Sequence, residues 1–189
     1  MYKEADIREA VEALRRGGVI LYPTDTVWGM GCDATNDDAV RRVFEIKRRS
    51  EGKALICLVD TPDRVQRYVR RVPQVAWDLM DLADKPLTLV LDGGKNLSPL
   101  VLAPDGSVGL RVTHEEISCA ICRRLQKPVV STSANVSGMP APRCFDEISD
   151  EIKAAADYIV PEKQKERRLV APSSVLKLTD DGCVTIIRK

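Results

Sequence analysis

The sequence predicts an α/β fold in which helices flank one open sheet of mixed strand direction. Helix-like and strand-like segments alternate along most of the chain, and two strand-like segments joined by a short turn follow near its end. Alternation favours parallel strands, whereas a hairpin adds antiparallel pairing, so a mixed sheet is expected. Because 189 residues suffice for one substantial core, we expect a single domain over residues 1–189.

The N-terminal segment predicts an amphipathic helix followed by a buried strand. Apolar residues recur at helical spacing from Ile7 to Leu14, and Gly17-Gly18 provides a C-terminal cap. The apolar run 19–22 is typical of a buried strand. A second helix is expected to begin after Asn36, whose side chain can cap it.

The remaining elements follow from the same patterns. Further helices are expected at 61–69, 73–83, 114–125 and 146–156, and strands at 55–59, 87–91, 108–112, 129–130, 158–160, 174–178 and 184–188. A turn at Asp180-Asp181-Gly182 joins the last two strands. The charged segment Glu162–Arg168 is expected to form a loop.

Charge and cysteine content narrow the class of protein. Twenty-nine Lys and Arg residues against 28 Asp and Glu leave a formal net charge of +1, so no overall basic field points to nucleic acid or an anionic membrane. No apolar run is long enough to span a membrane, and six cysteines without an export signal indicate a cytoplasmic location with free thiols. Cys119-x-x-Cys122 lacks the further ligands of a zinc site, so we expect no metal there and two small apolar residues on one helix face.

The segment Pro23–Asp33 is the first candidate for a ligand-binding loop. It follows a buried strand and is rich in hydroxyl groups and glycines, which allow backbone amides to approach a ligand. It matches neither a Walker loop nor a dinucleotide fingerprint. An ordinary strand-to-helix turn remains the alternative interpretation.

Lys47 is the second candidate. It shares a helix face with the apolar Val40, Val43 and Phe44, which directs its side chain inward. A lysine near a helix end that only covers the core edge is the alternative. Arg49 and Lys53 follow, and three cations around one loop suit a polyphosphate or a carboxylate.

The third candidate is Ser131–Gly138, which follows the predicted strand 129–130. Ligand sites in α/β sheets lie beyond the carboxyl ends of strands, where this segment is expected. A Ser- and Asn-rich turn that satisfies its own backbone is the alternative.

Taken together, the motifs resemble those of the YrdC/Sua5 family. The resemblance rests on the segments Pro23–Gly31, Lys47-x-Arg49 with Lys53-Ala54-Leu55, Leu110-Arg111-Val112 with His114, Ser131–Gly138 and Pro172–Val175. It covers nearly the whole chain and matches the short, single-domain form of the family. It implies a YrdC-like twisted open mixed sheet flanked by helices.

The resemblance implies an L-threonylcarbamoyl-AMP synthase, a nucleotidyltransferase that uses L-threonine, bicarbonate and ATP with Mg²⁺. A downstream threonylcarbamoyl transferase complex then modifies tRNA. By motif position, Lys47 and Arg49 are the expected catalytic residues. The expected ATP-binding residues are Arg49, Lys53, Ser107, Asn135, Arg143 and Arg188. The expected threonine-binding residues are Thr24, Thr26, Arg111, Ser133 and Ser173.

Attack of a carbamate oxygen on a phosphate needs charge neutralisation and alignment rather than a covalent nucleophile. We therefore predict no Ser-His-Asp triad and a positional role for His114, the one histidine. The loop Glu162–Arg168 is a hypothetical lid that would exclude water.

The chain also departs from the family pattern. Ser50 and Ala54 replace prolines, Ala83–Thr88 replaces a Trp-Pro-Gly-Pro motif, and Leu58 replaces a histidine that some members carry. The alternative function is an RNA-binding or ribosome-assembly module, which the basic doublets would serve. An aromatic content of 4% argues against stacking on single strands.

Overall fold

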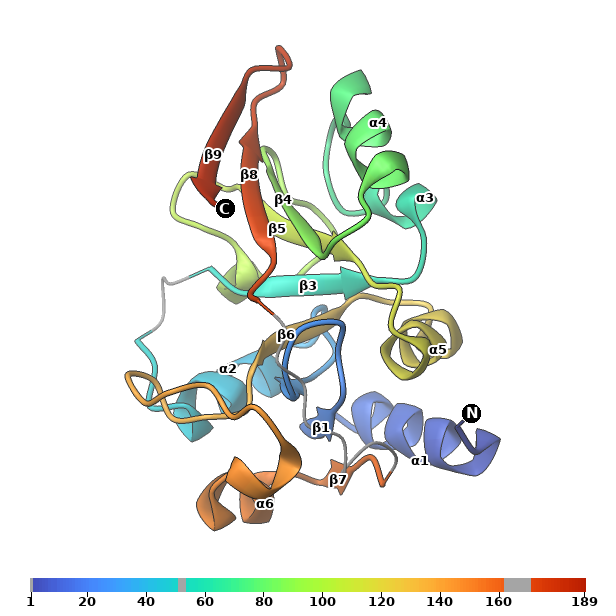
Figure 1. Cartoon of the computed structure of the whole chain (residues 1–189), viewed down its shortest axis with the longest axis vertical. Helices are drawn as coiled ribbons and strands as arrows, with labels where there is room; N and C mark the ends of the chain where they lie inside the picture. Colours follow the sequence, from blue (N-terminus) through green and yellow to red (C-terminus); the bar gives the residue numbers. More distant parts are fainter. Residues whose placement is uncertain (1, 51–53, 162–170) are drawn as a thin grey trace.

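A computed structural model describes residues 2–50, 54–161 and 171–189 and contains a nine-stranded sheet in the order β7-β1-β2-β6-β3-β5-β4-β8-β9 (Figure 1). The strands are β1 Ile20–Tyr22, β2 Gly29–Gly31, β3 Ile56–Val59, β4 Leu87–Leu91, β5 Val108–Val112, β6 Val129–Ser133, β7 Tyr158–Ile159, β8 Ser174–Leu178 and β9 Val184–Arg188. The α-helices are α1 Glu4–Arg15, α2 Asp37–Ile46, α3 Pro62–Val65, α4 Gln74–Leu82, α5 Glu116–Leu125 and α6 Asp150–Ala155, with 3-10 turns η1 Pro99–Val101 and η2 Phe145–Glu147. None of the helices described has the length and apolar character needed to cross a membrane.

The sheet is mixed, as the sequence predicts. The pairs β1–β7, β3–β5 and β4–β8 are parallel, and the other neighbouring pairs are antiparallel. The terminal hairpin β8–β9 forms as expected. It pairs through β8 with β4, so that the C-terminal segment completes one side of the sheet.

The predicted caps of the first two helices are confirmed. After α1, Gly17 adopts a positive φ of 77°, and the Gly17 and Gly18 amides donate to the carbonyls of Leu14 and Ala13. These two hydrogen bonds end the helix, and they form because Gly17 can adopt the left-handed conformation. The Asn36 side chain accepts a hydrogen bond from the Ala39 amide at the start of α2.

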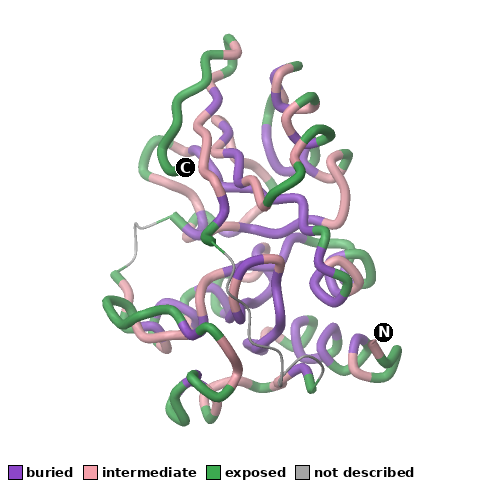
Figure 2. The backbone as a smooth tube through the Cα atoms, in the orientation of Figure 1, coloured by how far each residue is buried: buried purple, intermediate pink, exposed green. Residues whose placement is uncertain are grey.

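Two hydrophobic clusters cover opposite faces of the sheet, because successive strand residues point to opposite sides. Ile20 and Tyr22 pack with α1 and α5, whereas Leu21 packs in the cluster that contains α2 and α4. Figure 2 shows that buried residues follow the central strands, and that β9 is exposed along its length. Because the central strands are packed on both faces, their ends are held in fixed positions. The candidate site lies at these strand ends.

Two predicted helices differ from the structure. The segment 61–69 contains only the short helix α3, because the chain then turns so that Val69 forms a bridge with Gly94. The segment 146–156 is divided into η2 and α6, since Ser149 caps α6 by accepting a hydrogen bond from the Ile152 amide.

The two predicted ligand loops are more regular than expected. Residues 29–31, predicted as part of a loop, form the strand β2, and β6 continues through Ser133 instead of ending at Val130. Gly29 of β2 pairs with Ser133 of β6, so the two segments are neighbouring antiparallel strands. A Cβ atom at Gly31 would lie 1.9 Å from the Val130 carbonyl oxygen, and glycine therefore permits this close pairing.

Candidate active site

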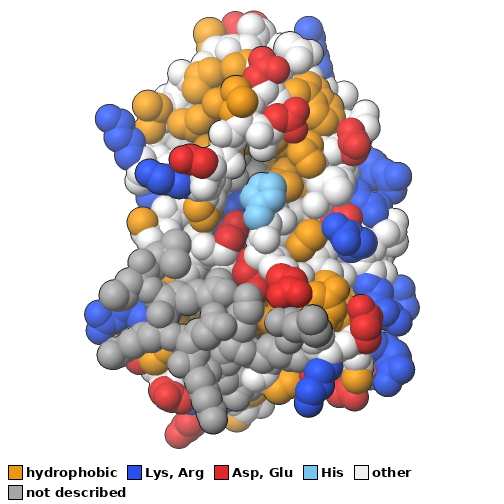
Figure 3. Space-filling view, turned by 45° about the vertical axis from the view of Figure 1, so that its right-hand side comes forward, with side chains coloured by type: hydrophobic (Ala, Val, Ile, Leu, Met, Phe, Trp, Pro, Cys, Tyr) orange, Lys and Arg blue, Asp and Glu red, His pale blue; other side chains and the backbone are white. Residues whose placement is uncertain are grey.

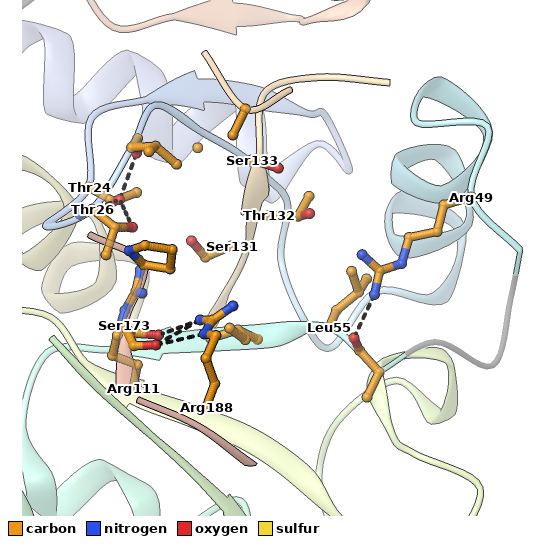
Figure 4. Close-up of a pocket in the computed structure, with 16 residues that line it drawn as sticks. Thr24, Thr26, Arg49, Leu55, Arg111, Ser131, Thr132, Ser133, Ser173 and Arg188 are labelled. Atoms are coloured by element: carbon orange, nitrogen blue, oxygen red, sulfur yellow. Dashed lines mark hydrogen bonds between the residues drawn. The ribbon is translucent and has the colours of Figure 1, made fainter. Parts of the chain in front are cut away.

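A cavity of about 370 Å³ opens where β1 and β6 end and β3 begins (Figure 4). Its wall combines hydroxyl groups, arginines and small apolar residues: Thr24, Thr26, Val27, Gly29, Arg49, Ala54, Leu55, Ile56, Arg111, Ser131, Thr132, Ser133, Ala141, Pro172, Ser173 and Arg188. The carboxyl ends of β1 and β6 meet here because both strands pair with β2. The cavity has the size of a small-molecule site.

A turn after β1 fixes the two threonines. The Thr24 hydroxyl donates to the Val27 carbonyl at 2.7 Å and accepts from the Thr26 amide at 3.1 Å. The two hydroxyl oxygens are 3.1 Å apart, and both side chains are buried. Such side-chain to backbone bonds stabilise a turn, so the sequence places two oriented hydroxyl groups at the cavity.

Arg111 reaches the cavity from the middle of β5. Its guanidinium lies 3.1 Å from the Asp25 carboxylate, and the two side chains are 4% and 11% exposed. Burial raises the pKa of Asp25, and the positive charge of Arg111 opposes this rise. Burial also lowers the pKa of Arg111, which Asp25 partly offsets.

Arg188 enters the cavity from the end of β9. Its guanidinium donates to the Ser173 carbonyl at 2.8 and 3.0 Å and to the Ser173 hydroxyl at 3.2 Å. The same hydroxyl lies 2.9 Å from that of Thr88, which is fully buried on β4. The terminal hairpin therefore delivers Arg188 to the site, and the residue just before the hairpin, Ser173, contributes a hydroxyl group.

Lys47 is buried at the end of α2, as the sequence predicts. Its ammonium donates to the carbonyls of Ser133 and Asn135 at 2.5 and 2.6 Å, and its own carbonyl accepts from the Ser137 amide at 2.8 Å. Burial, together with a smaller effect of the nearby positive charge of Arg49, lowers the pKa of Lys47 to about 8. In this arrangement Lys47 fixes the segment after β6, and its predicted catalytic role stays a prediction.

Arg49 lies across the cavity from Thr24 and Thr26 (Figure 4), with its guanidinium donating to the Ala54 carbonyl at 3.0 Å. Burial lowers its pKa. Arg49 and Ser133 also line a neighbouring cavity of about 260 Å³ together with Lys47 and Asn135. The two cavities thus share a wall that contains Arg49 and Ser133.

The structure brings most of the predicted site residues together, with two exceptions among the residues that it describes. Ser107 is buried outside the cavity wall, where its hydroxyl donates to Asp105 at 2.6 Å. Arg143 is exposed and pairs with Glu147 at 3.7 Å. Lys53 and the proposed lid Glu162–Arg168 lie outside the described residues. ATP binding by Ser107, Arg143 and Lys53 stays a prediction.

Sequence reasoning missed two residues that organise the site. Asp25, although it lies inside the first motif, was not expected to pair with an arginine that is distant in sequence. Thr88 orients Ser173 from another strand. Leu58, which replaces a histidine of some relatives, packs in the cluster with α1 and α5 and does not line the cavity.

Cys119 and Cys122 lie on α5 and are both unpaired. Burial raises the pKa of each thiol, so neither is activated as a thiolate. His114 borders a small hollow lined by Lys85 and apolar side chains, apart from the main cavity.

A model of the Sua5, YciO and YrdC proteins, described as telomere recombination, matches residues 12–189. The chain belongs to this family. Among family members, the Threonylcarbamoyl-AMP synthase of Hahella chejuensis is 33% identical over 83% of this chain and 86% of its own length. The protein of the same name from Idiomarina loihiensis is 32% identical over 94% of this chain and 100% of its own length.

Solved structures of the family share this fold. Sua5 of P. abyssi, in complex with L-threonine, superposes with a TM-score of 0.86 and 28% identity over 93% of this chain and 52% of its own. This chain therefore spans about half the length of that Sua5 protein. YciO of E. coli superposes with a TM-score of 0.84 and 28% identity over 99% of this chain and 90% of its own.

Proposed function

We propose that this protein is a threonylcarbamoyl-AMP synthase, a nucleotidyltransferase that forms threonylcarbamoyl-adenylate and pyrophosphate from L-threonine, bicarbonate and ATP. The observation that carries the proposal is the cavity in which Arg49, Arg111 and Arg188 converge on hydroxyl-rich strand ends. Guanidinium groups bind carboxylates and phosphates through paired hydrogen bonds. The two relatives named above carry this activity in their names and match over 86% and 100% of their length.

The threonine site in this proposal is the side of the cavity formed by Thr24, Thr26, Arg111 and Ser173. Arg111 binds the α-carboxylate, because its buried guanidinium offers charge in a region of low polarity. The hydroxyl groups orient the remaining polar atoms of the amino acid. A related Sua5 structure contains L-threonine, which supports an amino-acid site in this fold.

ATP occupies the opposite side and the neighbouring cavity. Arg49 faces both cavities, and Asn135 and Lys47 border the second. Arg188 lines the same cavity as Arg111, and its charge lowers the pKa of Arg111, so the two arginines favour bound anions, the α-carboxylate at Arg111 and the phosphates at Arg188. The phosphates of ATP then lie next to the carbamate formed on threonine.

The reaction proceeds in two balanced steps. The threonine amino group condenses with bicarbonate to form N-carboxy-threonine and water. A carbamate oxygen then attacks the α-phosphorus of ATP, and the bond to the β-phosphate breaks to release pyrophosphate. Arginines neutralise the charge that develops on the phosphate oxygens, so no covalent nucleophile of the protein takes part.

Mg²⁺ with ATP remains a prediction. In the described part of the chain, no three His, Cys, Asp or Glu side chains gather into a set of metal ligands. When bound, the metal would coordinate phosphate oxygens of ATP, and no step above depends on it. We also propose a cytoplasmic location, which six free cysteines support, and transfer of the product to tRNA by a downstream threonylcarbamoyl transferase complex.

Pyrophosphate release tests the proposal. The purified protein with ATP, Mg²⁺, bicarbonate and L-threonine is expected to release pyrophosphate, and omission of threonine is expected to abolish the release. Replacement of threonine by alanine, which lacks the hydroxyl group, serves as a second control. Release that is equal with and without threonine would contradict the proposed function.

A further inference from the structure

Asp25 is a buried carboxylate that the proposed reaction does not yet use. It lies between Thr24 and Thr26, and its side chain is 11% exposed. Its nearest charged partner is Arg111, at 3.1 Å, on a strand far away in sequence. A buried ion pair of this kind contributes little to stability on balance, because the desolvation of both charges offsets their attraction. Stability alone therefore does not account for the pair.

The hydrogen bonds of the pair are incomplete. Among the described residues, none forms a hydrogen bond with either carboxylate oxygen of Asp25 or with the Nε atom of Arg111. The 3.1 Å contact thus places opposite charges together without an aligned hydrogen bond. Arg111 retains donor capacity that a ligand in the cavity can fill, since a guanidinium carries five N–H groups.

The positive charge of Arg188, which lines the same cavity, also acts on Arg111. The charges of Arg188 and Arg111 repel each other, and Arg188 is held by the Ser173 carbonyl and hydroxyl. Without Asp25, the buried guanidinium of Arg111 would keep this repulsion and lose its ion pair with the carboxylate of the turn. The attraction between Asp25 and Arg111 offsets the repulsion from Arg188.

We propose that Asp25 is a positioning residue for threonine, whose carboxylate holds the Arg111 guanidinium in place to receive the α-carboxylate of the amino acid. This inference rests on the proposed function. Asp25 is expected to affect the binding of threonine and not the binding of ATP. The reason is that Asp25 contacts Arg111, on the threonine side of the cavity, and not Arg49.

Calorimetric titration of L-threonine and steady-state kinetics test this role with Asp25→Asn, which keeps the shape and removes the charge. The dissociation constant for threonine is expected to rise about tenfold or more, which corresponds to about 1.4 kcal/mol. The KM for ATP is expected to stay within about twofold of the wild-type value. A loss of threonine affinity without a change in the KM for ATP distinguishes positioning of Arg111 from a general loss of structure.

Asp60→Asn is the matched control. Asp60 and Arg64 form another buried pair at 3.0 Å, with side chains 6% and 13% exposed, and neither lines the cavity. Both Asn variants are expected to have lower melting temperatures, but only Asp25→Asn is expected to lose threonine affinity. Should Asp25→Asn fail to fold, Asp25→Glu takes its place, because it displaces the charge by one methylene group and is expected to weaken threonine binding roughly threefold.

Three results would overturn the role of Asp25. They are wild-type threonine affinity in Asp25→Asn, an equal loss of threonine and ATP affinity in that variant, or wild-type affinity in Asp25→Glu when the Asn variant does not fold. A wild-type protein that neither binds threonine nor releases pyrophosphate in its presence would instead overturn the proposed function, and the role of Asp25 with it. The two failures are thus distinguished by the wild-type titration.

Discussion

Lys47 shows how one buried charge organises the loop beside the cavity. Its ammonium and its carbonyl together contact Ser133, Asn135 and Ser137, so one residue at the end of α2 holds the segment after β6. The apolar helix face predicts that Lys47 points inward. The sequence does not reveal that its partners are backbone carbonyls, because carbonyl groups leave no signature in the residue types.

The proposed reaction is expected to slow above about pH 8, where Lys47 loses its proton, since burial and the charge of Arg49 lower its pKa to about 8. The protonated form makes charge-assisted hydrogen bonds that the neutral amine makes more weakly, so activity is present below this pH and declines above it. Lys47→Arg keeps its charge to a higher pH and is expected to shift the alkaline limb upward at a lower maximal rate. The measurement is kcat/KM for threonine against pH, and an identical limb in both proteins would argue against Lys47 as its origin.

Arg49→Ala is expected to lower kcat/KM for pyrophosphate release by roughly 100-fold, the usual effect of removing a group that stabilises charge in a transition state. Arg41→Ala is the control, because Arg41 is exposed on α2 and pairs with Asp38 at 3.0 Å. Its activity is expected to match the wild type. Near-normal turnover in Arg49→Ala would show that this arginine only covers the end of α2.

Within the sheet, the pairing of β2 with β6 is what converts two polar loops into a rigid wall. The strand β2 is short and glycine-rich, so neither an alternation of apolar and polar residues nor β-propensity predicts it. The long helices and the terminal hairpin could be predicted, because their apolar periodicity and turn residues are local signals. β2, the extension of β6 and the contact between Asp25 and Arg111 depend on tertiary pairing, which residue patterns do not record.

Gly31→Ala is expected to destabilise the fold by about 1–3 kcal/mol or more, because its Cβ would lie 1.9 Å from the Val130 carbonyl oxygen. Gly109→Ala on β5 is the matched control, since the nearest atom to its Cβ is 3.6 Å away. Its free energy of unfolding is expected to change by less than about 1 kcal/mol. Urea unfolding measures both, and equal stability of the two variants would refute the close pairing of β2 with β6.

The charge pattern of the described surface argues against RNA binding as the main function. Basic side chains on α2 and just after it pair with acidic ones, including Arg42 with Asp157 at 2.6 Å and Arg48 with Glu151 at 2.6 Å. On the face seen in Figure 3, basic and acidic side chains are interspersed. The described residues of this face therefore create no single-sign field of the kind that concentrates a polyanion.

Unmodified tRNA is therefore expected to bind more weakly than ATP at physiological salt. Filter binding of tRNA and calorimetric titration of ATP, in the same buffer, provide the comparison. A steep decrease of tRNA affinity with salt would indicate contacts to phosphates. Affinity for tRNA above that for ATP would favour the RNA-binding alternative.

Mass spectrometry of the reaction product tests the central claim most directly. The protein is incubated with ATP, Mg²⁺, L-threonine and ¹³C-labelled bicarbonate, and the adenylate is isolated. The proposed function predicts an adenylate that contains both threonine and one ¹³C atom from bicarbonate. An adenylate without ¹³C, or no threonine-containing adenylate at all, would contradict it.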